Sequence, residues 1–102
     1  MTIELLYFDG CPNHDALVPH LRGLLAEAGI DATIELRRVE TIEDAERERF
    51  LGSPTIRVDG RDVDPGAAAR VDFGMKCRLY ATEQGMRGSP PDSWILAALA
   101  GV

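Results

Sequence analysis

The fold of this chain is decided by the stretch Ile3–His14, which reads IELLYFDGCPNH. Its first six residues are mostly strand formers, and Asp9-Gly10 ends them, which predicts a short strand buried on both faces. From Asn13 to Gly29 the apolar side chains recur at the three- and four-residue spacing of one helical face. Cys11 is therefore expected between a buried strand and the N-terminus of a helix.

The rest of the chain continues this alternation of strands and helices. Further elements are predicted as a strand over 32–37, a helix from Thr41, a strand over 55–58 turned by Asp59-Gly60 into a strand over 61–63, and a helix from Pro90. The region 64–88 is interpreted as a loop with a short helix near 67–70 and a strand at 77–80. The order strand, helix, strand, helix, strand, strand, helix predicts one α/β domain over residues 1–102.

Composition and charge exclude several classes of protein. At 102 residues, 45% apolar and 27% charged, the chain has room for one globular domain and is not a disordered tail. Its net charge of −6 argues against nucleic acid or an anionic membrane as a partner, because phosphate binding needs a basic face. No apolar run is long enough for a transmembrane helix, and the N-terminus Met1-Thr2-Ile3-Glu4 lacks the basic start and small-residue cleavage site of a signal peptide, so a cytoplasmic location is expected.

The two cysteines, Cys11 and Cys77, are too few for a disulfide scaffold. At the N-terminus of a helix, unpaired backbone N–H groups and the helix dipole favour an anion, so a thiolate at Cys11 would be stabilised. The alternative is that Cys11 is a small buried apolar residue.

Four segments, taken together, resemble the thioredoxin-fold superfamily. They are Cys11-Pro12-Asn13-His14 in the place of the Cys-x-x-Cys motif, Pro19 in the place of the helix proline, Gly52-Ser53-Pro54-Thr55-Ile56 in the place of the cis-proline segment, and the Asp59-Gly60 hairpin. The resemblance implies a central mixed four-stranded sheet flanked by helices. It also implies that Cys11 is the nucleophile, and that Pro12, Ser53 and Pro54 form the substrate groove, with a cis Ser53-Pro54 bond and main-chain hydrogen bonds from Ser53 to an extended substrate.

The sequence departs from that pattern at three positions. His14 stands in place of the second cysteine, Gly10 in place of the usual tryptophan and Leu5 in place of the buried acid. Cys11 therefore has no resolving thiol in its own motif, and ordinary thioredoxin activity is not implied. An external thiol would resolve it, as in monothiol glutaredoxins, or Cys77 would.

Cys77 and His14 each allow more than one interpretation. In the resembled fold the loop before the last helix passes near the active cysteine, which makes Cys77 a candidate resolving thiol, with Lys76 and Arg78 expected to lower its pKa. Alternatively, Cys77 packs beneath its neighbours. His14 either stabilises the Cys11 thiolate, joins it as a metal ligand, or is a solvated polar residue.

The first functional hypothesis is a small thiol–disulfide oxidoreductase without a cofactor. Its catalytic residues would be Cys11, Cys77 and His14, and its substrate a protein or low-molecular-weight thiol or disulfide. A second hypothesis is binding of a soft metal or an organomercurial by Cys11, Cys77 and His14, as in mercury resistance. A third is an inactive interaction domain on the same scaffold. The sequence leaves the oligomeric state open.

Overall fold

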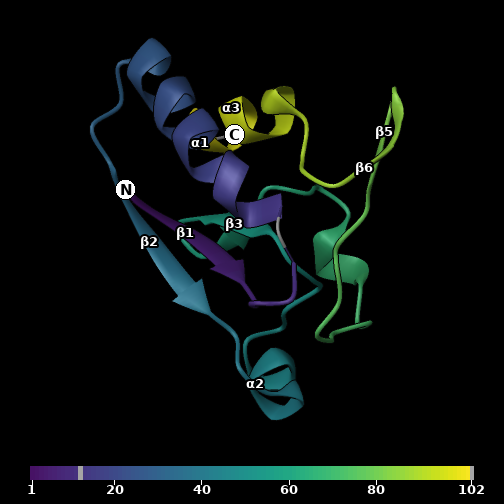
Figure 1. Cartoon of the computed structure of the whole chain (residues 1–102). Helices are drawn as coiled ribbons and strands as arrows, with labels where there is room; N and C mark the ends of the chain where they lie inside the picture. Colours follow the sequence, from purple (N-terminus) through teal and green to yellow (C-terminus); the bar gives the residue numbers. More distant parts are fainter. Residues whose placement is uncertain (12, 102) are drawn as a thin grey trace.

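Strand β1 (Thr2–Tyr7) lies inside a four-stranded mixed sheet (Figure 1). In the computed structural model, which describes residues 1–11 and 13–101, β1 pairs in parallel with β2 (Thr33–Arg38) and antiparallel with β3 (Thr55–Val58). Strand β4 (Arg61–Asp62) then pairs antiparallel with β3, which gives the order β2-β1-β3-β4. The predicted α/β class with a mixed four-stranded sheet is confirmed.

The helices cover both faces of this sheet. Helix α1 (Asn13–Ala28) and helix α3 (Asp92–Leu99) lie on one face, and α2 (Ile42–Arg47) lies on the other (Figure 1). Ile3 and Leu5 of β1 belong to the core on the α1 and α3 side, whereas Leu6 packs with Ala45 and Phe50 on the α2 side. The strand before Cys11 is thus buried on both faces, as its apolar run predicts.

Two local signals in the sequence have the expected structural effect. The side chain of Thr41 caps α2 by accepting a hydrogen bond from the N–H of Asp44 at 3.0 Å. Asp59 and Gly60 both have positive φ, at 50° and 83°, as a tight turn of the type I′ class requires between β3 and β4.

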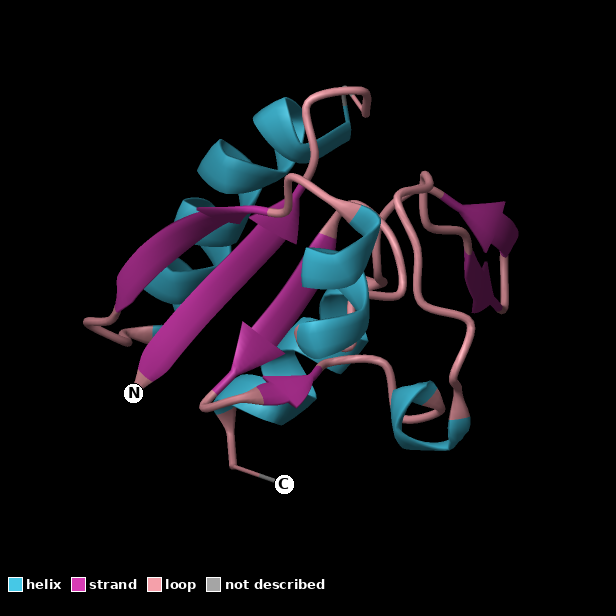
Figure 2. Ribbon diagram, turned by 90° about the horizontal axis from the view of Figure 1, so that it is seen from below, coloured by secondary structure: helices cyan, strands magenta, loops and turns pink. Residues whose placement is uncertain are grey.

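The region 64–88 is only partly as predicted. The short helix is present as a 3₁₀ turn, η1 (Ala67–Ala69), but the predicted strand at 77–80 is wrong. Instead β5 (Tyr80–Thr82) and β6 (Gly85–Arg87) form a separate hairpin beside the main sheet (Figure 2), and Cys77 makes one isolated parallel bridge to Ser53. That bridge does not extend because Thr55, the next residue in register after Ser53, already pairs with Leu6 of β1.

None of the helices in residues 1–11 and 13–101 has the length and apolar character needed to cross a membrane.

Candidate functional site

The loop that joins α2 to β3 places Ser53 beside Cys11. The Ser53-Pro54 peptide bond is cis, as predicted, and both residues are buried. The Cys11 thiol, which is 0% exposed, donates a hydrogen bond to the carbonyl oxygen of Ser53 at 3.4 Å. Pro12, the third residue expected to line the groove, lies outside the described residues.

A second piece of chain lies along Ser53, and we call residues 76–78 the Cys77 segment. The N–H of Ser53 donates to the carbonyl of Lys76 at 2.8 Å, and the N–H of Arg78 donates to the carbonyl of Ser53 at 2.9 Å. The main-chain groups that Ser53 was expected to offer to a substrate are thus bonded to the protein itself. The carbonyl of Ser53 accepts from both Cys11 and Arg78, and this brings Cys77 into the neighbourhood of Cys11.

Gly52 permits this close approach. A Cβ atom at position 52 would lie 2.9 Å from both the carbonyl oxygen of Lys76 and the Cβ of Arg78, and its φ of +129° is rarely adopted by other residues. Gly52-Ser53-Pro54 was recognised in the sequence, but the segment that it contacts was not.

Arg78 anchors the Cys77 segment to the β3–β4 hairpin. Its side chain is 0% exposed and donates to the hydroxyl of Thr55 at 3.0 Å, to Asp62 at 2.7 Å and to Asp64 at 3.3 Å. The guanidinium also lies 4.4 Å from the ring centroid of Tyr80, whose hydroxyl donates to the carbonyl of Pro54 at 2.6 Å.

Sequence reasoning missed this anchor and interpreted Arg78 only as a cation beside Cys77. In the structure Arg78 and Tyr80 are buried, whereas Cys77 and Leu79 are exposed. An arginine between two apolar residues would be expected on the solvent side, so the local sequence carries no signal for the burial of Arg78.

Cys77 is exposed, and its surroundings differ from those predicted. The pKa of Cys77 is raised, first by side-chain hydrogen bonding with Cys11, then by partial burial and by the charge of the Cys11 thiolate. The expectation that Lys76 and Arg78 lower this pKa is wrong, because Lys76 pairs with Asp72 at 2.8 Å and Arg78 is turned toward the hairpin. The structure therefore brings the two thiols together, and both are free.

His14 is held against the main chain of the cysteine motif. Its Nδ1 donates to the carbonyl oxygen of Cys11 at 2.8 Å, its Nε2 lies 3.1 Å from the carboxylate of Asp15, and its ring stacks on Tyr7 with a centroid distance of 4.2 Å. At 16% exposure His14 is not the solvated residue of the third interpretation, and its bonds join it to the backbone and to Asp15.

A metal site with three ligands would need Cys11, Cys77 and His14 to converge. Within residues 1–11 and 13–101, no group of three or more His, Cys, Asp or Glu side chains is arranged to hold a metal ion. The described site is a pair of thiols, with a histidine that supports the backbone of one of them.

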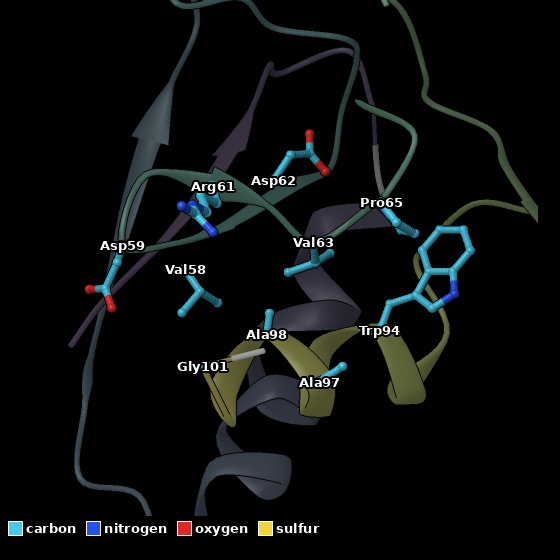
Figure 3. Close-up of a pocket in the computed structure, with 10 residues that line it drawn as sticks. All are labelled: Val58, Asp59, Arg61, Asp62, Val63, Pro65, Trp94, Ala97, Ala98 and Gly101. Carbon is cyan, nitrogen blue, oxygen red and sulfur yellow. The ribbon is translucent and has the colours of Figure 1, made fainter. Parts of the chain in front are cut away.

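Two hollows flank the β3–β4 hairpin, and neither is lined by Cys11 or Cys77. One of about 550 Å³ lies between the hairpin and α3, where Val58 and Val63 face Ala98 and where Trp94 lies at one end (Figure 3). The second has a volume of about 570 Å³ and lies on the other side of the hairpin, against Arg57 and Phe73. The chemistry of the thiols is therefore separate from these hollows.

In comparisons with known proteins, no family model, no curated protein and no solved structure matches the chain.

Proposed function

We propose that this chain is a thioredoxin-like thiol–disulfide oxidoreductase whose redox pair is Cys11 and Cys77. The observation that carries the proposal is the double use of Ser53, whose carbonyl accepts from the Cys11 thiol while its main chain holds the Cys77 segment. Two thiols held side by side by one residue can form and release a disulfide with little movement of the fold.

Three further features support the thioredoxin-like part of the proposal. The sheet order β2-β1-β3-β4 has its one parallel pair between β1 and β2, which α1 connects. The cis Ser53-Pro54 bond lies directly before β3, and its serine contacts the cysteine that precedes α1. Two segments that the sequence resemblance singled out independently therefore meet in space.

The proposed reaction is a two-step exchange. One protein thiolate attacks a sulfur of the substrate disulfide, a mixed disulfide forms, and the first substrate thiolate leaves and takes up a proton. The second protein thiol loses its proton and attacks the protein sulfur of the mixed disulfide, which releases the second substrate thiol. The substrate gains two electrons, the protein ends as a Cys11–Cys77 disulfide, and an external dithiol reduces it again.

Mass spectrometry of the products of thiol–disulfide exchange tests the proposal. Reduced protein is treated with oxidised glutathione, unreacted thiols are blocked with iodoacetamide, and the products are digested and mapped. We expect a Cys11–Cys77 disulfide in the natural chain, reopened by dithiothreitol, and a glutathione adduct in Cys11→Ser and Cys77→Ser. A natural chain that accumulates only glutathione adducts, with no internal disulfide, overturns the proposal.

The same pair supports a second candidate, binding of a soft metal or an organomercurial. Two adjacent thiolates suffice for the linear coordination of Hg(II), without a third ligand. Mass spectrometry with Hg(II) should then give a one-to-one adduct that survives competition by a monothiol, and either Cys→Ser change should abolish it. An adduct that is equally resistant without Cys77 removes this candidate.

A further inference from the structure

The two thiols of the redox pair differ sharply in exposure. Cys11 is 0% exposed, whereas Cys77 is exposed to solvent. A thiol attacks a disulfide along the S–S axis and must therefore reach the substrate sulfur directly. On the basis of the proposed function, we propose that Cys77 makes the first attack on an external disulfide and that the buried Cys11 then resolves the mixed disulfide. The substrate is a small disulfide rather than an extended peptide. This reverses the order of attack expected from the sequence.

The first part of the proposal follows from what covers Cys11. Its thiol points to the carbonyl of Ser53, and the Cys77 segment lies on the same residue through two main-chain hydrogen bonds of 2.8 and 2.9 Å. Arg78 fixes that segment to Asp62, Asp64 and Thr55. A substrate that approaches this end of the molecule therefore meets Cys77 before Cys11.

The substrate class follows from the same hydrogen bonds. An extended peptide that docked on the loop 52–54 by β-pairing would need the free main-chain N–H and C=O of a loop residue such as Ser53. Here both are bonded to the Cys77 segment, which occupies the position of a docked peptide. A low-molecular-weight disulfide needs no main-chain pairing and requires only the exposed sulfur of Cys77.

The steps balance as follows. The Cys77 thiolate attacks one sulfur of a small disulfide RS–SR, the Cys77–SR bond forms, and RS⁻ leaves and is protonated. The Cys11 thiol then loses its proton and attacks the sulfur of Cys77, which forms the Cys11–Cys77 disulfide and releases the second RS⁻. The neighbouring Cys11 raises the pKa of Cys77, which lowers its thiolate fraction at neutral pH but makes that thiolate a stronger nucleophile.

The test uses 2,2′-dithiodipyridine, a small uncharged disulfide whose released thione absorbs light. The reduced natural chain should release two equivalents and end with an internal disulfide. Cys11→Ser should release one equivalent at a rate no lower than the first step of the natural chain, and should retain the pyridyl adduct on Cys77. Cys77→Ser should react at least about tenfold more slowly, because only the buried thiol remains. Cys11→Ala replaces Cys11→Ser if the serine variant does not fold.

A disulfide-linked dimer of a short unstructured peptide tests the substrate class. The quantity measured is the rate of reaction with 2,2′-dithiodipyridine divided by the rate of reaction with the peptide dimer. We expect this ratio to be at least about tenfold larger for the natural chain than for free N-acetylcysteine. Two results overturn the inference: Cys77→Ser reacting as fast as the natural chain, or no added discrimination against the peptide dimer. In either case, release of two equivalents of thione by the natural chain together with an internal disulfide still supports the proposed function. Release of thione without an internal disulfide contradicts the proposed function itself.

Discussion

Gly52 lies so close to Arg78 that a Cβ atom at position 52 would be 2.9 Å from the Cβ of Arg78. The absence of a side chain at this position allows the Cys77 segment to reach Ser53, because the carbonyl oxygen of Lys76 lies at the same short distance. The position of the Cys77 segment beside Ser53, to which Cys11 is bonded, thus depends on a glycine that belongs to neither cysteine's own segment.

The first prediction concerns Gly52→Ala. The added methyl group meets backbone atoms rather than a flexible side-chain end, and a φ of +129° is strained for alanine, so a loss of about 2–3 kcal/mol in the free energy of unfolding is expected. The Cys77 segment should also move away from Ser53. Urea unfolding measures the first effect, and alkylation of Cys11 by iodoacetamide in the Cys77→Ser background, which should become faster, measures the second.

Gly85→Ala is the matched control for this change. Gly85 also has a positive φ, +99°, but no atom lies within 4 Å of the position that its Cβ would occupy. This variant should lose stability through backbone strain alone and should leave the alkylation rate of Cys11 unchanged. Equal acceleration in both variants would show that general loosening, and not the close approach at Gly52, controls access to Cys11.

The second prediction concerns Arg78→Met. Methionine fills part of the buried volume but leaves Asp62, Asp64 and the hydroxyl of Thr55 without the guanidinium, so a loss of about 3–5 kcal/mol is expected. Arg87→Met, at an exposed position of β6, should change the free energy of unfolding by less than about 0.5 kcal/mol. A small loss for Arg78→Met would mean that the Cys77 segment is held by its main chain alone.

The third prediction concerns the pH dependence of Cys77. Side-chain hydrogen bonding with Cys11 raises the pKa of Cys77, so its alkylation in the natural chain should reach half its maximal rate at a higher pH than in a free thiol. Cys11→Ala removes that neighbour, and the midpoint should move to lower pH. Stopped-flow alkylation with mass mapping of Cys77 gives both profiles. Superimposable profiles would show that the two thiols do not interact.

Local signals in the sequence predicted the part of the fold that local physics determines. The apolar run of β1, the Thr41 cap and the Asp59-Gly60 turn each act within a few residues, and each is present in the structure. The position of the Cys77 segment depends instead on contacts with Ser53, which is distant in the sequence, and no pattern of neighbouring residues encodes them. The error over the pKa of Cys77 has the same origin.

The error concerning Cys77 shows the limit of reasoning from neighbours along the chain. The two adjacent cations have partners of their own, since Lys76 pairs with Asp72 and Arg78 with Asp62. The group that affects Cys77 most is Cys11, which only the tertiary structure brings near. In the same way, two of the three interpretations of His14 joined it to the Cys11 sulfur, whereas the structure bonds it to the carbonyl oxygen of Cys11.

The fourth prediction follows from that bond. His14→Phe keeps an aromatic ring to stack on Tyr7 but removes the donor to the Cys11 carbonyl, so a loss of about 1 kcal/mol in stability is expected. His14→Ala also removes the stacked ring and should lose about 1 kcal/mol more. Neither variant should slow the alkylation of Cys11 in the Cys77→Ser background. Slower alkylation in both would assign His14 to the thiolate itself.

The fifth prediction concerns Tyr80, whose hydroxyl donates to the carbonyl of Pro54 at 2.6 Å. Tyr80→Phe leaves that buried carbonyl without this donor, so a loss of about 1–2 kcal/mol at neutral pH is expected. Burial, above all, raises the pKa of Tyr80, so the folded chain keeps this hydroxyl protonated at pH values where the unfolded chain, with a pKa of about 10, ionises.

Since the unfolded state then binds fewer protons than the folded state, the stability contributed by Tyr80 falls as the pH rises above about 10. The difference between the natural chain and Tyr80→Phe should therefore shrink from neutral to alkaline pH, as urea unfolding at a series of pH values would show. Tyr7→Phe retains Tyr80 and should retain its contribution to the alkaline slope. A constant difference between the natural chain and Tyr80→Phe across this range would mean that Tyr80 ionises as readily in the folded chain as in the unfolded one, and that its hydroxyl does not hold the Pro54 carbonyl beside the two thiols.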